Sequence, residues 1–231
     1  MVVSIGDRPV VHSLVLPVLE SDGNSNEHVL AMCCSGIKGD ANWLLSQVQR
    51  YVTSVWDRYN FAQLTSPALS HYISSQMGSF QSYKVDNEWQ SGIGRENDVD
   101  WARPLGIQTM ILSLQDKDPN ILIVEPSGRV MVTGDMKSIK STTSRQWHYA
   151  CIGKDSDKIQ QRLGQKEDQF VSETKDSSVS KIVEGMIQLM LENSPKHEVT
   201  EFMVELVTRG KGIARNMSTY KNGKEVSSKA I

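Results

Sequence analysis

The order of the expected elements predicts an α+β layered domain with antiparallel sheets. Helical and strand-like patterns come in blocks: early strands, two helices, a strand meander, one or two helices, and final strands. Three short apolar runs follow one another so closely between residues 105 and 133 that they indicate an antiparallel meander. A doubly wound nucleotide fold would instead alternate strands and helices one by one. The block order therefore favours the α+β class.

The apolar pattern defines the elements of the first half. Residues 28–34 predict a short strand buried on both faces, which ends at Ser35-Gly36. Apolar residues at helical spacing predict an amphipathic helix over 41–58, with Asp40 as its N-cap. Ser66-Pro67, a capping residue followed by proline, is typical of the start of a second helix.

The second half is expected to contain strands at 105–114, 121–124, 129–133 and 147–152, a short helix at 156–163, and a third long helix that begins after Ser177 or Ser178. Alternation over 199–208 predicts a strand with Glu201 and Glu205 on a half-solvated face. We expect one domain over 1–215 and a flexible C-terminal tail over 216–231.

Composition excludes several function classes. The net charge of −2 over 231 residues gives no reason to expect a nucleic-acid or membrane-surface partner. No apolar run approaches the roughly 20 residues that span a bilayer. Three cysteines, two of them adjacent, do not make a disulfide framework, which favours a reducing compartment. The expected location is the cytoplasm and nucleus.

The candidate chemical groups favour packing over catalysis. Cys33 and Cys34 point to opposite faces of one strand, and His28 lies too far along that strand to act as their base. Ser35 lacks the G-x-S-x-G nucleophile elbow, and the glycine pair Gly92 and Gly94 follows no predicted strand. The five histidines have no metal-site spacing with cysteines or carboxylates. We therefore expect no catalytic residue, no cofactor and no metal.

Four stretches together resemble the α-type subunits of the 20S proteasome. "SGIKGDANWLLSQVQRYV" is similar to the SGL-x-ADAR turn of that family, and "ARPLGIQTMILSL" to its RP-(F/L)-G element. "VEPSGRV" is similar to its DPSG hairpin, and "ACIGKDSDKIQQRL" to its AIG-x-GS strand and helix. Each stretch alone is a generic turn, but the four occur in the family's order and at its spacing from Glu27 to Leu163.

The resemblance implies a fold, a function and partners. The fold would be the four-layer αββα sandwich with antiparallel sheets of the amino-terminal-nucleophile hydrolases. The function would be that of a non-catalytic structural subunit in a seven-membered ring, with other proteasome α and β subunits and regulatory particles as partners. Gly36 and Ile37 would belong to an activator-tail pocket. Trp43 and Tyr51, on an aromatic-rich helix, either fill the core or face a neighbouring subunit.

Two alternatives remain open beside the α-type subunit. The chain has no counterpart of the family's amino-terminal pore helix, and Asp22 stands where the pocket lysine is expected. A β-type subunit, inactive or processed, is therefore the second hypothesis. The third is an independent amino-terminal-nucleophile hydrolase, for which Ser4 is the nearest serine to the start.

Overall fold

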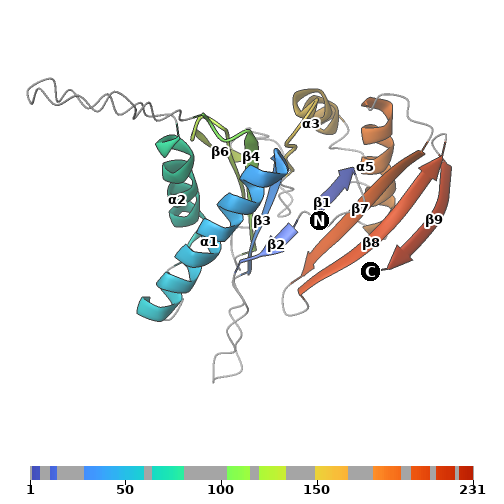
Figure 1. Cartoon of the computed structure of the whole chain (residues 1–231). Coiled ribbons are helices and arrows are strands. Elements are labelled where there is room, and N and C mark those ends of the chain that lie inside the picture. Colours follow the sequence, from blue (N-terminus) through green and yellow to red (C-terminus); the bar gives the residue numbers. More distant parts are fainter. Residues whose placement is uncertain are drawn as a thin grey trace, which may run out of the picture.

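A computed structural model shows a mixed α and β protein with two antiparallel sheets and, among the described residues, four helices. The structure describes residues 2–5, 11–14, 29–59, 64–80, 103–114, 120–133, 149–165, 179–193, 199–208, 212–221 and 224–230. The α+β class predicted from the block order is confirmed at this level (Figure 1). The glycine pair Gly92 and Gly94 lies outside the described residues.

The five-stranded sheet contains the meander and has the order β2-β3-β4-β5-β6. Its strands are β2 (Val11–Ser13), β3 (Val29–Gly36), β4 (Ile107–Leu114), β5 (Asn120–Val124) and β6 (Val130–Thr133). All neighbours are antiparallel, and the pairing of β3 with β4 runs without interruption from Val29–Leu114 to Gly36–Ile107.

The four-stranded sheet joins the start of the described chain to its end, in the order β1-β7-β8-β9. Its strands are β1 (Val2–Ile5), β7 (Val199–Thr208), β8 (Gly212–Lys221) and β9 (Lys224–Ala230). The interval 216–231, expected as a flexible tail, contains the second half of β8 and all of β9. β9 has the polar sequence Lys-Glu-Val-Ser-Ser-Lys-Ala. Composition does not predict such a strand, because a strand at the edge of a sheet needs little apolar surface.

Two helices pack on one face of the five-stranded sheet. α1 (Lys38–Tyr59) and α2 (Ser66–Ser79) contribute a stripe of fully buried side chains that meets alternate residues of β3, β4 and β5. The largest members of this core are Leu30, Met32, Leu44, Leu69, Ile73, Met77, Ile107 and Ile111. The helices lie on the left in Figure 1, and the four-stranded sheet lies on the right.

The other two helices are associated with the four-stranded sheet. α5 (Val179–Asn193) contacts β1, and its Ile187 packs with Val204 of β7. α3 (Ser156–Gln165) contacts α5, and Arg162 of α3 forms an exposed ion pair with Glu192 of α5 at 3.2 Å. The second sheet thus has its own apolar cluster on its helix-bearing face.

The two sheets contact each other where β1 and β7 approach β2 and β3. Val2 of β1 packs against a buried cluster formed by Val11, Ala31, Cys33 and Met110 of the five-stranded sheet. Glu205 of β7 is fully buried at this junction, and its Oε2 accepts a hydrogen bond from the Val11 backbone N–H at 3.1 Å. The prediction that Glu205 lies on a half-solvated face is therefore wrong, because that face of β7 is covered by the opposite sheet.

Three local predictions are corrected by the structure. α1 begins at Lys38, so Asp40 lies inside its first turn rather than at the N-cap. The N-cap of α2 is Thr65, whose hydroxyl accepts from the Ala68 N–H at 3.3 Å, and Ser66 follows it within the helix. Within the expected strand 147–152, residues 149–152 are not a strand, although Ala150 and Ile152 do pack against the junction of the sheets.

Candidate functional site

The turn from β3 into α1 is closed by a backbone contact with the segment that precedes β4. Gly36 has a φ of +132°, a backbone conformation that residues other than glycine rarely adopt. A Cβ at Gly36 would lie 2.1 Å from the Gly106 carbonyl oxygen. That same oxygen accepts a hydrogen bond from the Ile37 N–H at 2.9 Å. The two stretches "SGIKGD" and "RPLG" are therefore parts of one structural unit.

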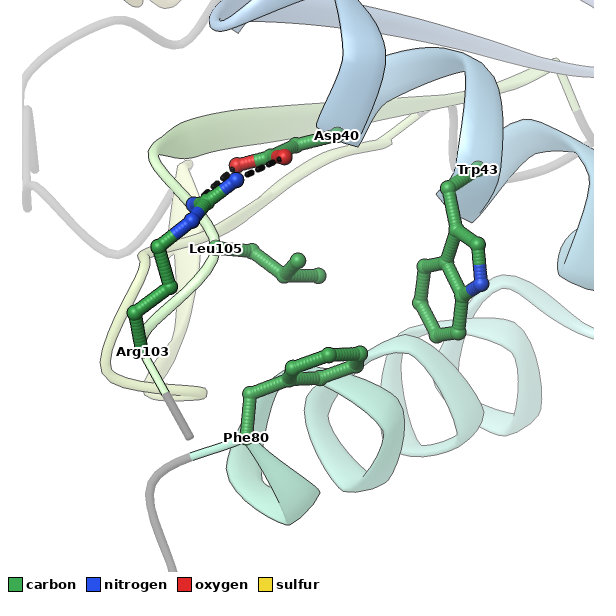
Figure 2. A pocket seen from close by; sticks show the side chains of 5 residues that line it. All are labelled: Asp40, Trp43, Phe80, Arg103 and Leu105. Carbon is green, nitrogen blue, oxygen red and sulfur yellow. Dashed lines mark hydrogen bonds and ion pairs between the residues drawn. The ribbon is translucent and has the colours of Figure 1, made fainter. Parts of the chain in front are cut away.

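An ion pair completes this unit. Arg103 donates from Nη1 to Asp40 Oδ2 at 2.7 Å and from Nη2 to Asp40 Oδ1 at 2.6 Å, a two-pronged arrangement that Figure 2 shows. The Gly106 N–H donates to Asp40 Oδ2 at 2.9 Å. The Arg103 hydrogen bonds and then the Gly106 N–H lower the pKa of Asp40 to about 2, so this carboxylate is ionised at neutral pH. Its position in the first turn of α1 also favours the negative charge.

The stretch "ACIGKDS" reaches the same end of the five-stranded sheet. The Gly153 N–H donates to the Gln108 side-chain carbonyl at 2.8 Å, and Gln108 is paired with Ser35 across β4 and β3. Gly153 has φ +100°, and a Cβ there would lie 2.5 Å from Ser35 Oγ. The glycine is thus required both by its backbone conformation and by the close approach of Ser35.

The fourth stretch, "EPSG", joins β5 to β6 and contacts α2. Gly128 has φ +77°, and a Cβ there would lie 3.0 Å from the Ser74 carbonyl oxygen. The Ser74 hydroxyl donates a hydrogen bond to the Gly128 carbonyl. In three of the four stretches, then, the glycine has a positive φ, at Gly36, Gly128 and Gly153, and in the fourth the Ile37 side chain lies close to Gly106.

A pocket of about 280 Å³ lies beside the Asp40–Arg103 pair. Trp43 of α1 and Phe80 after α2 meet edge to face, with ring centroids 4.9 Å apart, and Leu105 forms the apolar floor (Figure 2). Asp40 has little accessible surface, whereas 61% of the Arg103 side chain is exposed. No local sequence pattern predicts this pocket, since its five residues come from three separate stretches.

The residues predicted as sites have different environments. Gly36 and Ile37 are exposed at the start of α1, and Ile37 keeps 52% of its surface. Trp43 and Tyr51 are partly buried and make contacts within the chain: Trp43 with Phe80, and Tyr51 with the ring of Tyr72, stacked at 4.1 Å. The most exposed aromatic side chain described on α1 is Trp56, at 40%.

The cysteines and Ser4 do not have the features of nucleophiles. Burial is the main cause that raises the pKa of Cys33 and of Cys34, and it raises the pKa of Cys151 to about 11. Ser4 lies within β1 opposite Met203, and its hydroxyl donates to the Met203 carbonyl at 3.4 Å. Ser4 could become an amino terminus only by removal of the residues that form the first half of β1.

Two comparisons with known proteins returned no match. No protein-family model matches the chain, and no curated protein matches it significantly. Within the described part, no helix is long and apolar enough to cross a membrane, and no group of three or more histidine, cysteine or carboxylate side chains could hold a metal ion.

The ion pair makes the stability of the fold sensitive to acid. Because the pKa of Asp40 falls from 3.8 to about 2 on folding, its contribution is fully present above pH 4 and is lost as pH falls from 4 towards 2. We expect Asp40→Asn to lower the melting temperature at pH 7 and to lower it less at pH 2.5. Thermal unfolding followed by circular dichroism measures both values. An equal loss at the two pH values would contradict the role assigned to the ionised carboxylate.

Proposed function

We propose that the chain is a non-catalytic structural subunit of the 20S proteasome core, most similar to the α-type, that contributes to a seven-membered ring around the proteolytic chamber. The observation that carries this proposal is the interlocking of the family-like stretches. Gly36 meets Gly106, Gly153 meets Ser35, and Gly128 meets α2. Three of the four stretches therefore meet one another, and generic turns that share a spacing by chance would have no reason to do so.

The packing supports the finer fold that belongs to this proposal, a four-layer αββα sandwich. α1 and α2 cover the outer face of the five-stranded sheet, and α5 contacts the four-stranded sheet. The contact between Glu205 and the Val11 N–H joins the two inner faces. These contacts support the layer order helix, sheet, sheet and helix that the proposal requires.

The proposal of a structural rather than catalytic subunit rests on two arguments. The thiols of Cys33, Cys34 and Cys151 are held in the protonated form by burial, so none is prepared as a nucleophile. Ser4 is an internal strand residue whose exposure as an amino terminus would remove part of β1. A hydrolase of this class needs its nucleophile at a free amino terminus.

Native mass spectrometry of the tagged chain purified from its own cells tests the function. We expect the chain in a large ring-shaped particle that also contains proteasome α and β subunits. Trp56→Ala should lower the fraction of the chain found in that particle without lowering the chain's melting temperature by more than a few degrees, because Trp56 is the most exposed aromatic side chain described on α1. Ser54→Ala, at a neighbouring exposed position, is the control. A chain recovered without other proteasome subunits would refute the proposal.

A further inference from the structure

β6 forms an apolar edge of the five-stranded sheet. It is the last strand in the sheet order, and among the described residues it pairs with β5 alone. Its sequence, Val-Met-Val-Thr, has no charged residue and no proline. Val130 and Val132 are 36% and 57% exposed, although large apolar side chains are usually covered. An uncharged strand with exposed valines at a sheet edge is a template for pairing with another strand.

The other sheet edges have features that discourage pairing. β9 has Lys224, Glu225 and Lys229, and its pairing with β8 is irregular between Thr219 and Tyr220. β2 is three residues long. Charges, irregular pairing and short length are the usual protections of edge strands, and the four-residue β6 has only the last of these. β1 is as short as β6, but its described side chains are half-buried: Val2 packs against the five-stranded sheet, and Val3 packs with Ile187 of α5.

The two exposed valines lie on the same face of the sheet as the helices. Val130 is paired with Val124 and Val132 with Leu122, and both partners are buried in the core beneath α1 and α2. Opposed residues of neighbouring strands place their side chains on one face. The apolar surface of this face therefore continues past α2 to the edge of the sheet.

We propose that β6 pairs with the β6 strand of a second copy of this chain, antiparallel and centred on Met131. In this register Val130 lies opposite Val132 of the second copy, and Val132 opposite Val130, so both exposed valines gain an apolar partner on each side. The contact is isologous, because the same strand is used by both copies. The two five-stranded sheets then become one continuous sheet.

The helices leave room for this pairing. α2 contacts β5 and β4 more than β6, so it stands back from the edge. With strands about 4.8 Å apart, the two β5 strands would lie about 14 Å from each other, which exceeds the 8–10 Å at which helices pack. The two α2 helices therefore do not collide, and the valines occupy the space between them.

Charge does not oppose the pairing either. Arg129 lies next to β6, and in this register it stands opposite Thr133 of the second copy. The two Arg129 residues are separated by four residues along the strands, or about 14 Å. Repulsion between exposed charges at that distance is screened at physiological ionic strength. Because each strand has four residues, the buried area falls below the 1,200 Å² or so of stable interfaces, and the association is weak.

A dilution series by sedimentation velocity tests the pairing on the isolated full chain. We expect a reversible monomer–dimer equilibrium whose Kd rises at least tenfold in Val132→Lys. Thr53→Lys adds the same charge at an exposed position of α1 and should leave Kd unchanged. A wild-type chain that stays monomeric at every concentration overturns the proposal. Equal dissociation constants for the two lysine variants also overturn it, because association would then use another surface.

Disulfide cross-linking tests the register. Met131→Cys places two thiols across the two-fold axis, and oxidation should give a covalent dimer above the wild-type background. Arg129→Cys places them about 14 Å apart, beyond the 7 Å or so that a disulfide spans between Cα atoms, and should give none. Equal cross-linking of the two variants overturns the register. These measurements use the isolated chain, so they test the β6 pairing alone. Native mass spectrometry of the purified particle tests the proposed function, and either experiment can fail while the other succeeds.

Discussion

Gly36→Ala is expected to cost about 3 kcal/mol or more of the free energy of unfolding, which would leave much of the protein unfolded. Two costs add. The alanine would have to hold a φ of +132°, and its Cβ would lie 2.1 Å from the Gly106 carbonyl oxygen. Relief requires the backbone before β4 to move away, which breaks the hydrogen bond from the Ile37 N–H to the same oxygen.

Gly39→Ala is the matched control for this prediction. Gly39 lies three residues further along, in the first turn of α1, and a Cβ there would meet no atom within 4 Å. Alanine has the higher helix propensity, so this variant should be as stable as the wild type or more stable by up to about 1 kcal/mol. Urea unfolding followed by tryptophan fluorescence compares the two. Similar midpoints for both variants would disprove the close approach of Gly36 to Gly106.

Glu205→Ala is expected to lower the free energy of unfolding by about 2–4 kcal/mol. The substitution removes the acceptor of the Val11 N–H and leaves a cavity between the two sheets, because Glu205 is fully buried. Glu205→Gln keeps a carbonyl oxygen of the same reach and should cost less. Glu184→Ala, on the exposed face of α5, should change the stability by less than about 0.5 kcal/mol.

Hydrogen exchange of the Val11 amide supplies an independent measurement. Its protection should fall in Glu205→Ala and persist in Glu205→Gln. An unchanged exchange rate at Val11 in the alanine variant would show that the carboxylate does not hold the two sheets together.

The sequence allowed the elements to be predicted better than their mutual contacts. Apolar spacing located α1 to within three residues at its start, because one buried stripe repeats over its whole length. The same kind of pattern placed Glu201 and Glu205 on one face of β7 but could not tell what covers that face. Whether an alternating strand faces water or another sheet depends on residues far along the chain, here Val11.

The candidate site shows the same limit. Asp40 and Arg103 are 63 positions apart, and each was noticed as part of a separate motif. Their pairing depends on how β3 and β4 align, with Gly36 opposite Ile107, which no local spacing encodes. The sequence predicts a cap at Asp40 because an acidic residue before a helix most often has that role, whereas in the structure Arg103 and the Gly106 N–H donate to its oxygens.

The contact between Gly36 and Gly106 restricts the mutational routes open to each position in different ways. At Gly106 the obstacle to a side chain is Ile37 Cδ1, at 2.6 Å, so a smaller residue at position 37 would make alanine acceptable there. At Gly36 the obstacle is a main-chain oxygen, which every amino acid carries. Position 106 can therefore drift once a permissive change at position 37 has occurred, whereas no substitution elsewhere in the chain removes the constraint on position 36.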